Sequence, residues 1–395
     1  MTTATSSCRS ASTPEPLSGP GASGAPDAWV ARRLEVADVR CWERAALDLP
    51  EGLVMLVGPN GAGKTSLVEA LVLGCLGVSP RTAREAEVVR RGAEALHVGL
   101  DLDGPGGRHR REIGFAPGRG RRLRLDGEPV RSLGAWRARA VLVFLPDELR
   151  AVKGPPAARR RALDRVLEAS APGFAEDLAA YQEALAQRNA LLRRIRAGQA
   201  SEVSLPAWEG PMAAHGARVA AARRAGAGAL AGPFATWLER LGGGPDGALA
   251  LETSPAGLAE VPGDALEEAL AETLRARRPR EVQAAQTLSG PHRDDLWMGA
   301  GPADLRHSGS QGEQRTAALA LLLASRDHLR RRAARPILLL DDVLSELDPE
   351  RRRLLLEAVR DGGQTVVTSA DPAAAGVLEE PPDALLSVRD GALGA

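Results

Sequence analysis

The chain has 395 residues, of which 44% are hydrophobic and 26% charged, and this composition excludes a mainly disordered protein. Basic and acidic residues balance at 51 each, so any nucleic-acid site has to be a local patch and not a property of the whole surface. The three cysteines have no metal-ligand spacing, and no apolar run approaches the roughly 20 residues that a bilayer requires. These features predict a cytoplasmic protein without a membrane span.

Residues 1–29 are rich in Ser, Pro, Ala and Gly and contain no apolar stretch of the kind that a signal peptide needs. Such a composition cannot bury enough apolar surface to order itself, which predicts a disordered leader. A misassigned start codon is the alternative explanation. We expect folded structure to begin at Ala31, where the first strand pattern starts.

Apolar and polar residues alternate or cluster in a clear order along the rest of the chain. Strand patterns and a first helix, over 66–77, fill residues 31–155, with several short strands separated by Gly and Asp turns. A long Ala-, Arg- and Leu-rich stretch, about 156–240, predicts helices, and a loop-rich return with one candidate strand follows it. The last third alternates helix, buried strand, helix and strand.

This order predicts an α/β fold with mixed sheets, split by a helical insertion. We assign residues 31–155 and 286–395 to the two parts of one head. Residues 156–285 would form a helical arm and its return to the head.

Residues 58–65 read GPNGAGKT and form a complete P-loop pattern between an apolar strand and a helix. Glycines let the backbone amides converge on a phosphate, together with the helix N-terminus. Lys64 would reach the β- and γ-phosphates of ATP, and the Thr65 hydroxyl would bind Mg²⁺. A chance glycine turn is the alternative, but the strand, loop and helix patterns agree. The predicted nucleotide-binding residues are Gly58, Pro59, Asn60, Gly61, Ala62, Gly63, Lys64, Thr65 and Ser66.

Residues 336–342 read PILLLDD, an apolar strand that ends in two carboxylates. Asp341 suits the Mg²⁺ contact of a Walker B motif, and Asp342 suits the residue that polarises the attacking water. Alone, this pattern also fits a buried strand followed by an acidic helix cap. Beside a P-loop, and followed by the SELD sequence at 345–348, it resembles Walker B and the D-loop of ABC ATPases.

Residues 308–315 read SGSQGEQR and precede an apolar helix. They are similar to the ABC signature loop, with Ser310 and Gly312 at the places of its serine and second glycine. A serine hydroxyl, a glycine amide and a helix N-terminus together make a second anion site. In the ABC class the γ-phosphate lies between the P-loop of one subunit and the signature of the other. The resemblance therefore implies a head-to-tail dimer that ATP holds together, in an ABC-type P-loop ATPase head.

Within that class the chain resembles the RecF family of bacterial recombination mediators, from about residue 31 to the C-terminus. The motifs that carry the resemblance are ADVRCW (37–42), GVSPRT (77–82), FLPDEL (144–149) with KGPP (153–156) and RRRALD (159–164), QRNALL (187–192), and GPHRDD (290–295). Arg40 stands at the arginine of the first motif and is expected to join the nucleotide-binding residues. Asp147 and Glu148 form an acidic pair to which we assign no role. Thr368 and Ser369 stand where transporter ATPases have a switch histidine, which RecF also lacks.

The resemblance implies a slow, DNA-stimulated ATPase of DNA recombination, repair, replication restart and the SOS response. ATP would close a homodimer on double-stranded or gapped DNA, hydrolysis would reopen it, and recombination mediator proteins of the same pathway would be partners. Arginine clusters could supply phosphate contacts, although each also fits a solvated helix face. The clusters are Arg108, Arg110 and Arg111; Arg119, Arg121, Arg122 and Arg124; 159–161; Arg193, Arg194 and Arg196; and 275–280.

Two alternatives stay open at this point. One is an ABC-type ATPase that drives a protein partner instead of DNA. The other is an overcoming-lysogenisation-type ATPase-nuclease, which would need a further acidic metal-binding domain after the last predicted strand. A chromosome-maintenance ATPase with a long coiled coil is disfavoured, because the spacing between Lys64 and Asp341 leaves room only for a short arm.

Overall fold

The computed structural model describes residues 27–394 apart from 105, 137, 139, 333, 346 and 390, and gives only the backbone of residues 27, 135, 146–148 and 334. The predicted leader lies outside the described residues up to position 26. Its last residues are folded, however, because β1 (Asp27–Ala28) pairs in parallel with β13 (Ala334–Arg335). The fold therefore begins before Ala31. The reason is Trp29, whose ring packs on the core and lies 5.6 Å from the Arg111 guanidinium.

The predicted alternation of strands and helices is present, with more strands than the sequence pattern indicates. The remaining strands are β2 (Val30–Val39), β3 (Trp42–Asp48), β4 (Leu53–Val57), β5 (Leu96–Gly104), β6 (Gly107–Ala116), β7 (Gly120–Leu125), β8 (Glu128–Val130), β9 (Val141–Phe144), β10 (Gly247–Glu252), β11 (Asp295–Ala300), β12 (Ala303–Asp304), β14 (Ile337–Leu340), β15 (Thr365–Ser369), β16 (Ala384–Arg389) and β17 (Ala392–Gly394). The helices are α1 (Lys64–Leu76), α2 (Leu133–Trp136), α3 (Pro156–Ser170), α4 (Phe174–Arg196), α5 (Pro206–Arg240), α6 (Leu266–Ala284), α7 (Gln311–Arg331) and α8 (Pro349–Arg360). Short 3₁₀ helices are η1 (Glu85–Glu87), η2 (Pro146–Ala151), η3 (Glu202–Ser204), η4 (Ala256–Ala259), η5 (Gly263–Ala265), η6 (Pro291–Arg293) and η7 (Pro372–Val377).

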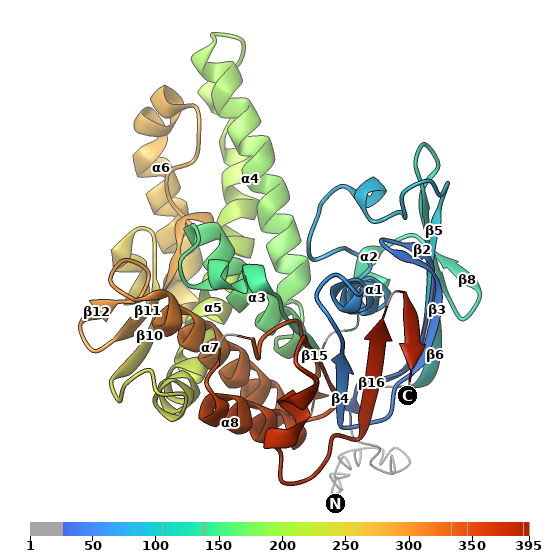
Figure 1. The fold of residues 1–395 in the computed structure, drawn as a ribbon. Coiled ribbons are helices and arrows are strands. Elements are labelled where there is room, and N and C mark those ends of the chain that lie inside the picture. Colours follow the sequence, from blue (N-terminus) through green and yellow to red (C-terminus); the bar gives the residue numbers. More distant parts are fainter. Residues whose placement is uncertain are drawn as a thin grey trace, which may run out of the picture.

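Two six-stranded sheets form the head, and α1 lies between them (Figure 1). One sheet has the order β17-β16-β4-β15-β14-β9 and is parallel except at β17, whereas the other, β3-β2-β5-β6-β7-β8, is antiparallel. Helix α1 is apolar on nearly all its sides and almost entirely buried, as expected for a helix inside a core. Gly74 permits its close approach to the antiparallel sheet, because a Cβ there would lie 2.9 Å from Leu100.

The helical insertion predicted for 156–240 consists of α3, α4 and α5, and it stands beside the parallel sheet, on the side away from the antiparallel sheet (Figure 1). Helix α5 returns to the head, where Phe234 and Trp237 join the same apolar core as α7. Helix α6 belongs to the arm and was not expected, since its sequence is highly charged and contains Pro279. In the described part of the chain, no helix has the length and apolarity that a membrane span requires.

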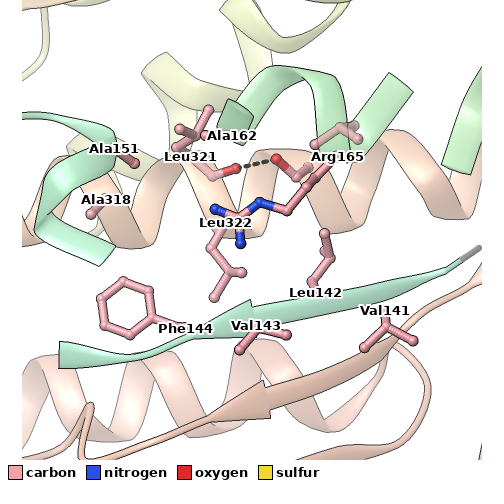
Figure 2. Close-up of a pocket in the computed structure, with 12 residues that line it drawn as sticks. Val141, Leu142, Val143, Phe144, Ala151, Ala162, Arg165, Ala318, Leu321 and Leu322 are labelled. Carbon is pink, nitrogen blue, oxygen red and sulfur yellow. Dashed lines mark hydrogen bonds between the residues drawn. The ribbon is translucent and has the colours of Figure 1, made fainter. Parts of the chain in front are cut away.

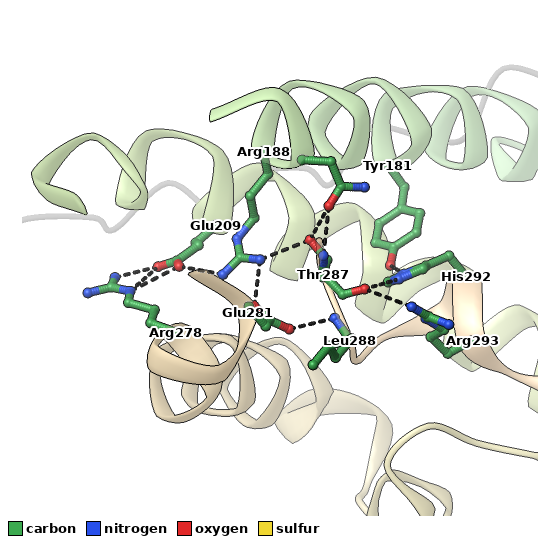
Figure 3. A network of polar contacts seen from close by, with 10 residues as sticks. Tyr181, Arg188, Glu209, Arg278, Glu281, Thr287, Leu288, His292 and Arg293 are labelled. Carbon is green, nitrogen blue, oxygen red and sulfur yellow. Dashed lines mark hydrogen bonds and ion pairs between the residues drawn. The ribbon is translucent and has the colours of Figure 1, made fainter. Parts of the chain in front are cut away.

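A buried arginine holds the arm together (Figure 3). Arg188 on α4 has no exposed surface and donates to Glu281 of α6 at 2.6 Å and to Glu209 of α5 at 3.0 Å. It also donates to Thr287, at 2.9 Å, on the segment that leads back to the head. Charges removed from water are tolerated only when they are paired and hydrogen-bonded in this way. One guanidinium thus fixes three helices and the return segment relative to each other.

Replacing Arg188 by Met should lower the free energy of unfolding by about 3–5 kcal/mol, because Glu281 would remain buried without its counter-charge. Urea unfolding followed by circular dichroism measures this change. The matched control is Arg196→Met on the exposed end of the same helix, which should stay within about 0.5 kcal/mol of the wild type. Equal stability of the two variants would show that the buried network does not hold the arm.

Candidate phosphate-binding site

Three neighbouring parallel strands end at one edge of the head sheet. The P-loop follows β4, Thr368 and Ser369 end β15, and Asp341 follows β14. Because the carboxyl ends of parallel strands meet at the same edge, residues far apart in the sequence are brought together there. The predicted P-loop and Walker B residues therefore share one site, with β15 between them.

The P-loop backbone adopts a shape that only its glycines allow. Gly63 has a φ of 105°, and a Cβ at this position would lie 2.7 Å from the Trp42 indole nitrogen and 2.9 Å from the Cys41 sulfur. The same indole donates a hydrogen bond to the Gly63 carbonyl at 3.1 Å. Trp42 is almost completely buried, so its indole supports the end of the loop from the protein interior. Gly61, with a φ of 81°, makes the outer turn.

Lys64 is the first residue of α1 and its side chain is largely buried. Its ammonium donates to the carbonyls of Gly58, at 2.6 Å, and Pro59, at 2.9 Å. Burial lowers the pKa of this ammonium, while the negative charges of Asp342 and Asp341 act in the opposite direction. An ammonium has three donors, so one remains for a phosphate oxygen while two hold the side chain at the loop.

Asp341 and Thr65 meet at the other side of the loop. The Thr65 hydroxyl donates to Asp341 Oδ1 at 3.0 Å, and the Thr368 hydroxyl donates to the same oxygen at 2.7 Å. The second oxygen, Oδ2, is buried and has no hydrogen-bond partner among the described residues. Burial raises the pKa of Asp341, which is the expected effect when a carboxylate lacks a nearby cation.

These residues fit a magnesium ion. Mg²⁺ is usually held by one or two protein groups, together with phosphate oxygens and water, and not by a complete cage of side chains. The described residues contain no group of three or more His, Cys, Asp or Glu that could hold a metal by themselves. An unsatisfied, buried oxygen of Asp341 beside the Thr65 hydroxyl is the donor set that a nucleotide-bound Mg²⁺ needs.

Asp342 lies directly after this carboxylate in a restricted backbone conformation. Its φ is 51°, a left-handed value that non-glycine residues adopt at a cost, and such strain is common at functional sites. The Asp342 amide donates to the Thr368 hydroxyl at 2.8 Å, which stabilises the turn. Its negative charge opposes the lowering of the pKa that burial causes at Lys64 and at Arg315. The position suits a residue that orients water near the phosphates.

Ser310 and Gly312 lie elsewhere, at the exposed N-terminus of α7. Ser310 caps this helix, accepting from the Glu313 amide at 3.3 Å, while its own amide donates to Glu313 at 2.7 Å. Gln314 anchors the loop through a 3.0 Å bond to the Leu305 carbonyl. In the described structure neither Ser310 nor Gly312 is hydrogen-bonded to the P-loop of its own chain. The helix N-terminus is exposed, and its first amides, which have no acceptor within a helix, are accessible to an outside anion.

Arg40, which the resemblance alone placed among the nucleotide-binding residues, is hydrogen-bonded to a residue that the sequence analysis did not single out. Both Nε and Nη2 of Arg40 donate to the Glu69 carboxylate at 2.8 Å. Glu69 is the one acidic residue of the apolar helix α1, and that contrast is the signal that could have found it. The side chains of Asp147 and Glu148 lie outside what the structure describes.

The predicted arginine clusters differ in how far their charge is cancelled. Arg108 pairs with Asp103, Arg110 with Glu35 and Asp101, and Arg111 is buried against two tryptophan rings. Arg159 pairs with Asp295, and Arg160 donates to the Asp294 carbonyl. In the last cluster Arg278 is bound to Glu209 and Arg275 to Glu268. These arginines are therefore held within the protein by carboxylates, backbone carbonyls or aromatic rings.

Two groups of exposed arginines lie together without an acidic partner among the described residues. Within the described part of the chain, no acidic group lies within ion-pair distance of the exposed guanidinium groups of Arg119, Arg122, Arg124, Arg193, Arg194 and Arg196. The first three belong to the hairpin that leads into β7 and to β7 itself, and the others form the last turn of α4, at the tip of the arm. Their charge is available to a phosphate backbone.

A cavity of about 50 Å³ lies between β9 and the helices α3 and α7 (Figure 2). It is lined mainly by aliphatic side chains, with Phe144 and Leu322 facing each other and Arg165 reaching in from α3. Pockets that bind small molecules are several hundred Å³ in volume. The cavity is therefore a packing defect and no second nucleotide site.

Comparison with known proteins places this geometry in a family. A family model described as an AAA domain matches residues 33–132. The chain is 39% identical over 348 residues to the DNA replication and repair protein RecF of Acidothermus cellulolyticus, covering 86% of this chain and 93% of that protein. It is 38% identical over 357 residues to RecF of Streptomyces avermitilis, with 87% and 95% covered.

Solved structures agree with the sequence relatives. The solved structure of the recombination mediator protein RecF-ATP in the RecFOR pathway superimposes on this chain with a TM-score of 0.83 at 26% identity. The match covers 95% of this chain and 99% of that one. A Pyrococcus furiosus Smc head domain shares the fold alone, with a TM-score of 0.55 at 16% identity and coverage of 92% and 95%. The predicted ABC-type ATPase head with a helical insertion is thus confirmed. By sequence and by structure, the chain belongs to the RecF family of DNA replication and repair proteins.

Proposed function

We propose that this chain is an ATP-dependent DNA-binding ATPase of recombinational repair and replication restart. The observation that carries the proposal is the contact between Thr65, Asp341 and Thr368 at the P-loop, which leaves one buried carboxylate oxygen for a nucleotide-bound cation. The comparison with RecF-ATP supports ATP as the nucleotide. Mg²⁺ would supply charge neutralisation of the β- and γ-phosphates.

The roles in ATP hydrolysis are then divided between residues of two copies of the chain. The P-loop amides and Lys64 stabilise the triphosphate, Thr65 and Asp341 hold the cation, and Asp342 orients the attacking water. The open N-terminus of α7, with Ser310 and Gly312, has no hydrogen bond to the P-loop in the described part of its own chain and completes the site of a second copy. ATP is therefore the bridge of a head-to-tail homodimer. Hydrolysis removes the bridging phosphate, so the dimer reopens.

The dimer would close on duplex or gapped DNA, and the uncancelled arginines of β7 and of the arm tip would contact its phosphates. Such contacts provide affinity without sequence recognition. DNA that stabilises the closed dimer would also stimulate its slow ATPase activity. Recombination mediator proteins of the same pathway would be further partners, in keeping with the RecFOR assignment of the structural relative.

Sedimentation of the chain with and without ATP·Mg²⁺ and a gapped duplex tests the proposal directly. ATP should convert monomer to dimer, and the duplex should strengthen that conversion. Lys64→Met should abolish the ATP effect, because the buried ammonium that contacts the phosphates is removed. The matched control is Lys153→Met, since Lys153 is exposed and is the only other lysine of the chain. A Lys64→Met chain that still dimerises with ATP would contradict the proposal that ATP bound at this P-loop bridges the two copies.

Asp342→Asn should separate dimer closure from turnover. The amide keeps the size of the side chain but cannot accept a proton from water, so the hydrolysis rate should fall by about 10²- to 10⁴-fold. ATP binding persists, and the closed dimer should accumulate in sedimentation experiments. Asp361→Asn, at an exposed position after α8, is the control and should turn over normally. Normal turnover in Asp342→Asn would remove the assigned role.

Neutralising uncancelled arginines should weaken DNA binding in a salt-dependent way. Removing one phosphate contact should lower the slope of log K against log salt by about 0.9. The variants are Arg122→Gln with Arg124→Gln, and the triple change to Gln at Arg193, Arg194 and Arg196. A charge-matched control is Arg108→Gln with Arg110→Gln, whose guanidinium groups are already paired. If the control lowers the slope as much as the β7 pair, exposed charge does not select the DNA contacts.

A further inference from the structure

A groove of about 590 Å³ opens on the head where the C-terminal ends of α5, α7 and α8 come together. Its volume is in the range of sites that bind ligands, unlike the small cavity beside β9. None of the residues predicted to bind nucleotide, cation or a second copy is among the described residues that line it. The groove is thus separate from the predicted ATP site.

The floor of the groove is rigid and its charges are cancelled. Asp327 on α7 accepts a hydrogen bond from the Trp237 indole of α5 at 2.6 Å. Its other oxygen accepts from two nitrogens of Arg326, at 2.8 Å and 3.1 Å. The buried Arg326 also donates to the Ala358 carbonyl of α8. These bonds join the three helices, so the protein itself fixes the shape of the groove.

Positive charge lies around this floor. The Arg240 guanidinium stands over the Trp237 ring, 4.2 Å from its centre. Arg330 and Arg331 are exposed in the last turn of α7. Over the ranges that the structure describes, no carboxylate lies within ion-pair distance of these three guanidinium groups. Their hydrogen-bond donors are therefore accessible to a ligand.

The acidic residues of the groove offset only part of this charge. Asp327 is neutralised by Arg326, and Glu357 accepts two bonds from Arg353, at 2.8 Å and 2.9 Å. Asp361, just after α8, is the one lining acid that no described side chain pairs with. The arginines around the floor thus outnumber the unpaired carboxylate, so the groove attracts a ligand with several negative charges.

The groove lies away from the surfaces that the proposed function uses. Helix α7 has 21 residues and is about 30 Å long, so the groove at its C-terminal end is far from Ser310 and Gly312 at its N-terminus. In Figure 1, α8 and the tip of α4, with its uncancelled arginines, lie at opposite ends of the molecule. A head-to-tail dimer closed on DNA therefore leaves the groove accessible.

We propose that this groove is a docking site for an acidic segment of a protein partner. Carboxylates of the segment bind Arg240, Arg330 and Arg331, and an apolar side chain packs on Trp237. Guanidinium groups pair with carboxylates through two parallel hydrogen bonds, so the charge and the donors of the groove both match such a segment. The inference gives the protein partnership of the proposed function a surface, and it rests on that function only for the geometry of the dimer.

A peptide fits the groove better than the phosphate backbone of a nucleic acid does. Each nucleotide carries a negative charge, so a backbone laid across the groove also meets the Asp361 carboxylate and is repelled. A peptide carries charge only at its acidic residues and can present an amide or an uncharged side chain to Asp361. The mixed lining of the groove therefore favours a protein segment.

Fluorescence anisotropy with a labelled synthetic peptide of Asp and Leu residues tests the site. The full chain should bind this peptide at low salt, and Arg330→Gln with Arg331→Gln should weaken binding by about 10- to 100-fold, the usual effect of losing hydrogen bonds to charged groups. The matched control is Arg193→Gln with Arg194→Gln, an adjacent exposed pair in the last turn of α4. Both pairs lose a small stabilisation of a helix end, but only the groove pair should change peptide affinity. An equal loss in the two pairs would show that the peptide binds exposed arginines in general and would overturn the proposal.

Asp361→Asn provides a test that does not depend on a loss of binding. Removing the repelling carboxylate should tighten peptide binding by about 2- to 5-fold, the effect of one exposed ion pair. Asp264→Asn, at an exposed position beside α6, is the control and should leave the affinity unchanged. If Asp361→Asn binds the peptide no more tightly than the control does, the peptide does not occupy the groove and the proposal is wrong.

A short DNA duplex is the second probe, because it separates a protein segment from a nucleic acid as the occupant. The groove pair should keep its affinity for the duplex, whereas the α4 pair should bind the duplex more weakly. If the groove pair weakens duplex binding as much as peptide binding, the groove is a further phosphate contact, and a protein partner is contradicted.

The failure of this inference can be told apart from failure of the proposed function, because peptide binding is measured with and without ATP. A chain that binds the peptide but neither binds ATP nor dimerises would contradict the proposed function and support the docking site. A chain that dimerises with ATP and DNA but does not bind the peptide would overturn the docking site alone. Release of the peptide when ATP closes the dimer would contradict the position of the groove outside the dimer interface.

Discussion

The Thr368 hydroxyl is the contact on which the geometry of the site depends. It donates to Asp341 at 2.7 Å and accepts from the amide of Asp342 at 2.8 Å, so one side chain fixes both residues of the predicted Walker B motif. It can do this because β15 lies between β4 and β14, which places its last residues midway between the P-loop and the carboxylates. Under the proposed function, a site held in this way would need little rearrangement to bind phosphate and a cation.

The local parts of this site could be predicted from sequence, because each motif contains its own physical reason. Residues 58–65 require glycine conformations and a following helix, and residues 336–342 combine a buried strand with terminal carboxylates. The role of Thr368 could not be predicted, since its sequence position shows only that a switch histidine is absent. Its bond to Asp341 exists because of the strand order, and nothing in a single sequence reports which strand lies between two others.

The arginine clusters show the same limit of prediction from a single sequence. The sequence displays every arginine cluster, but the acids that neutralise them come from distant segments, as when Glu35 pairs with Arg110 or Asp295 with Arg159. Only the structure separates paired guanidinium groups from the uncancelled ones of β7 and the arm tip. Helix α6 and the early start of the fold at Trp29 were missed for a related reason. Their stability comes from packing against distant parts of the chain and not from local pattern.

Several of the motifs that resemble RecF and lie outside the P-loop meet at the junction of arm and head. Arg159 bonds Asp295, and Arg223 bonds Asp164 and the Pro291 carbonyl. Tyr181 bonds His292 at 2.7 Å (Figure 3). The same segment continues through β11 and β12 into the signature loop. The network that orients the arm therefore also holds the strand leading to the loop that resembles the ABC signature. Under the proposed function, binding of a second copy's phosphate at that loop would be coupled to the position of the arm, because breaking a buried ion pair costs several kcal/mol.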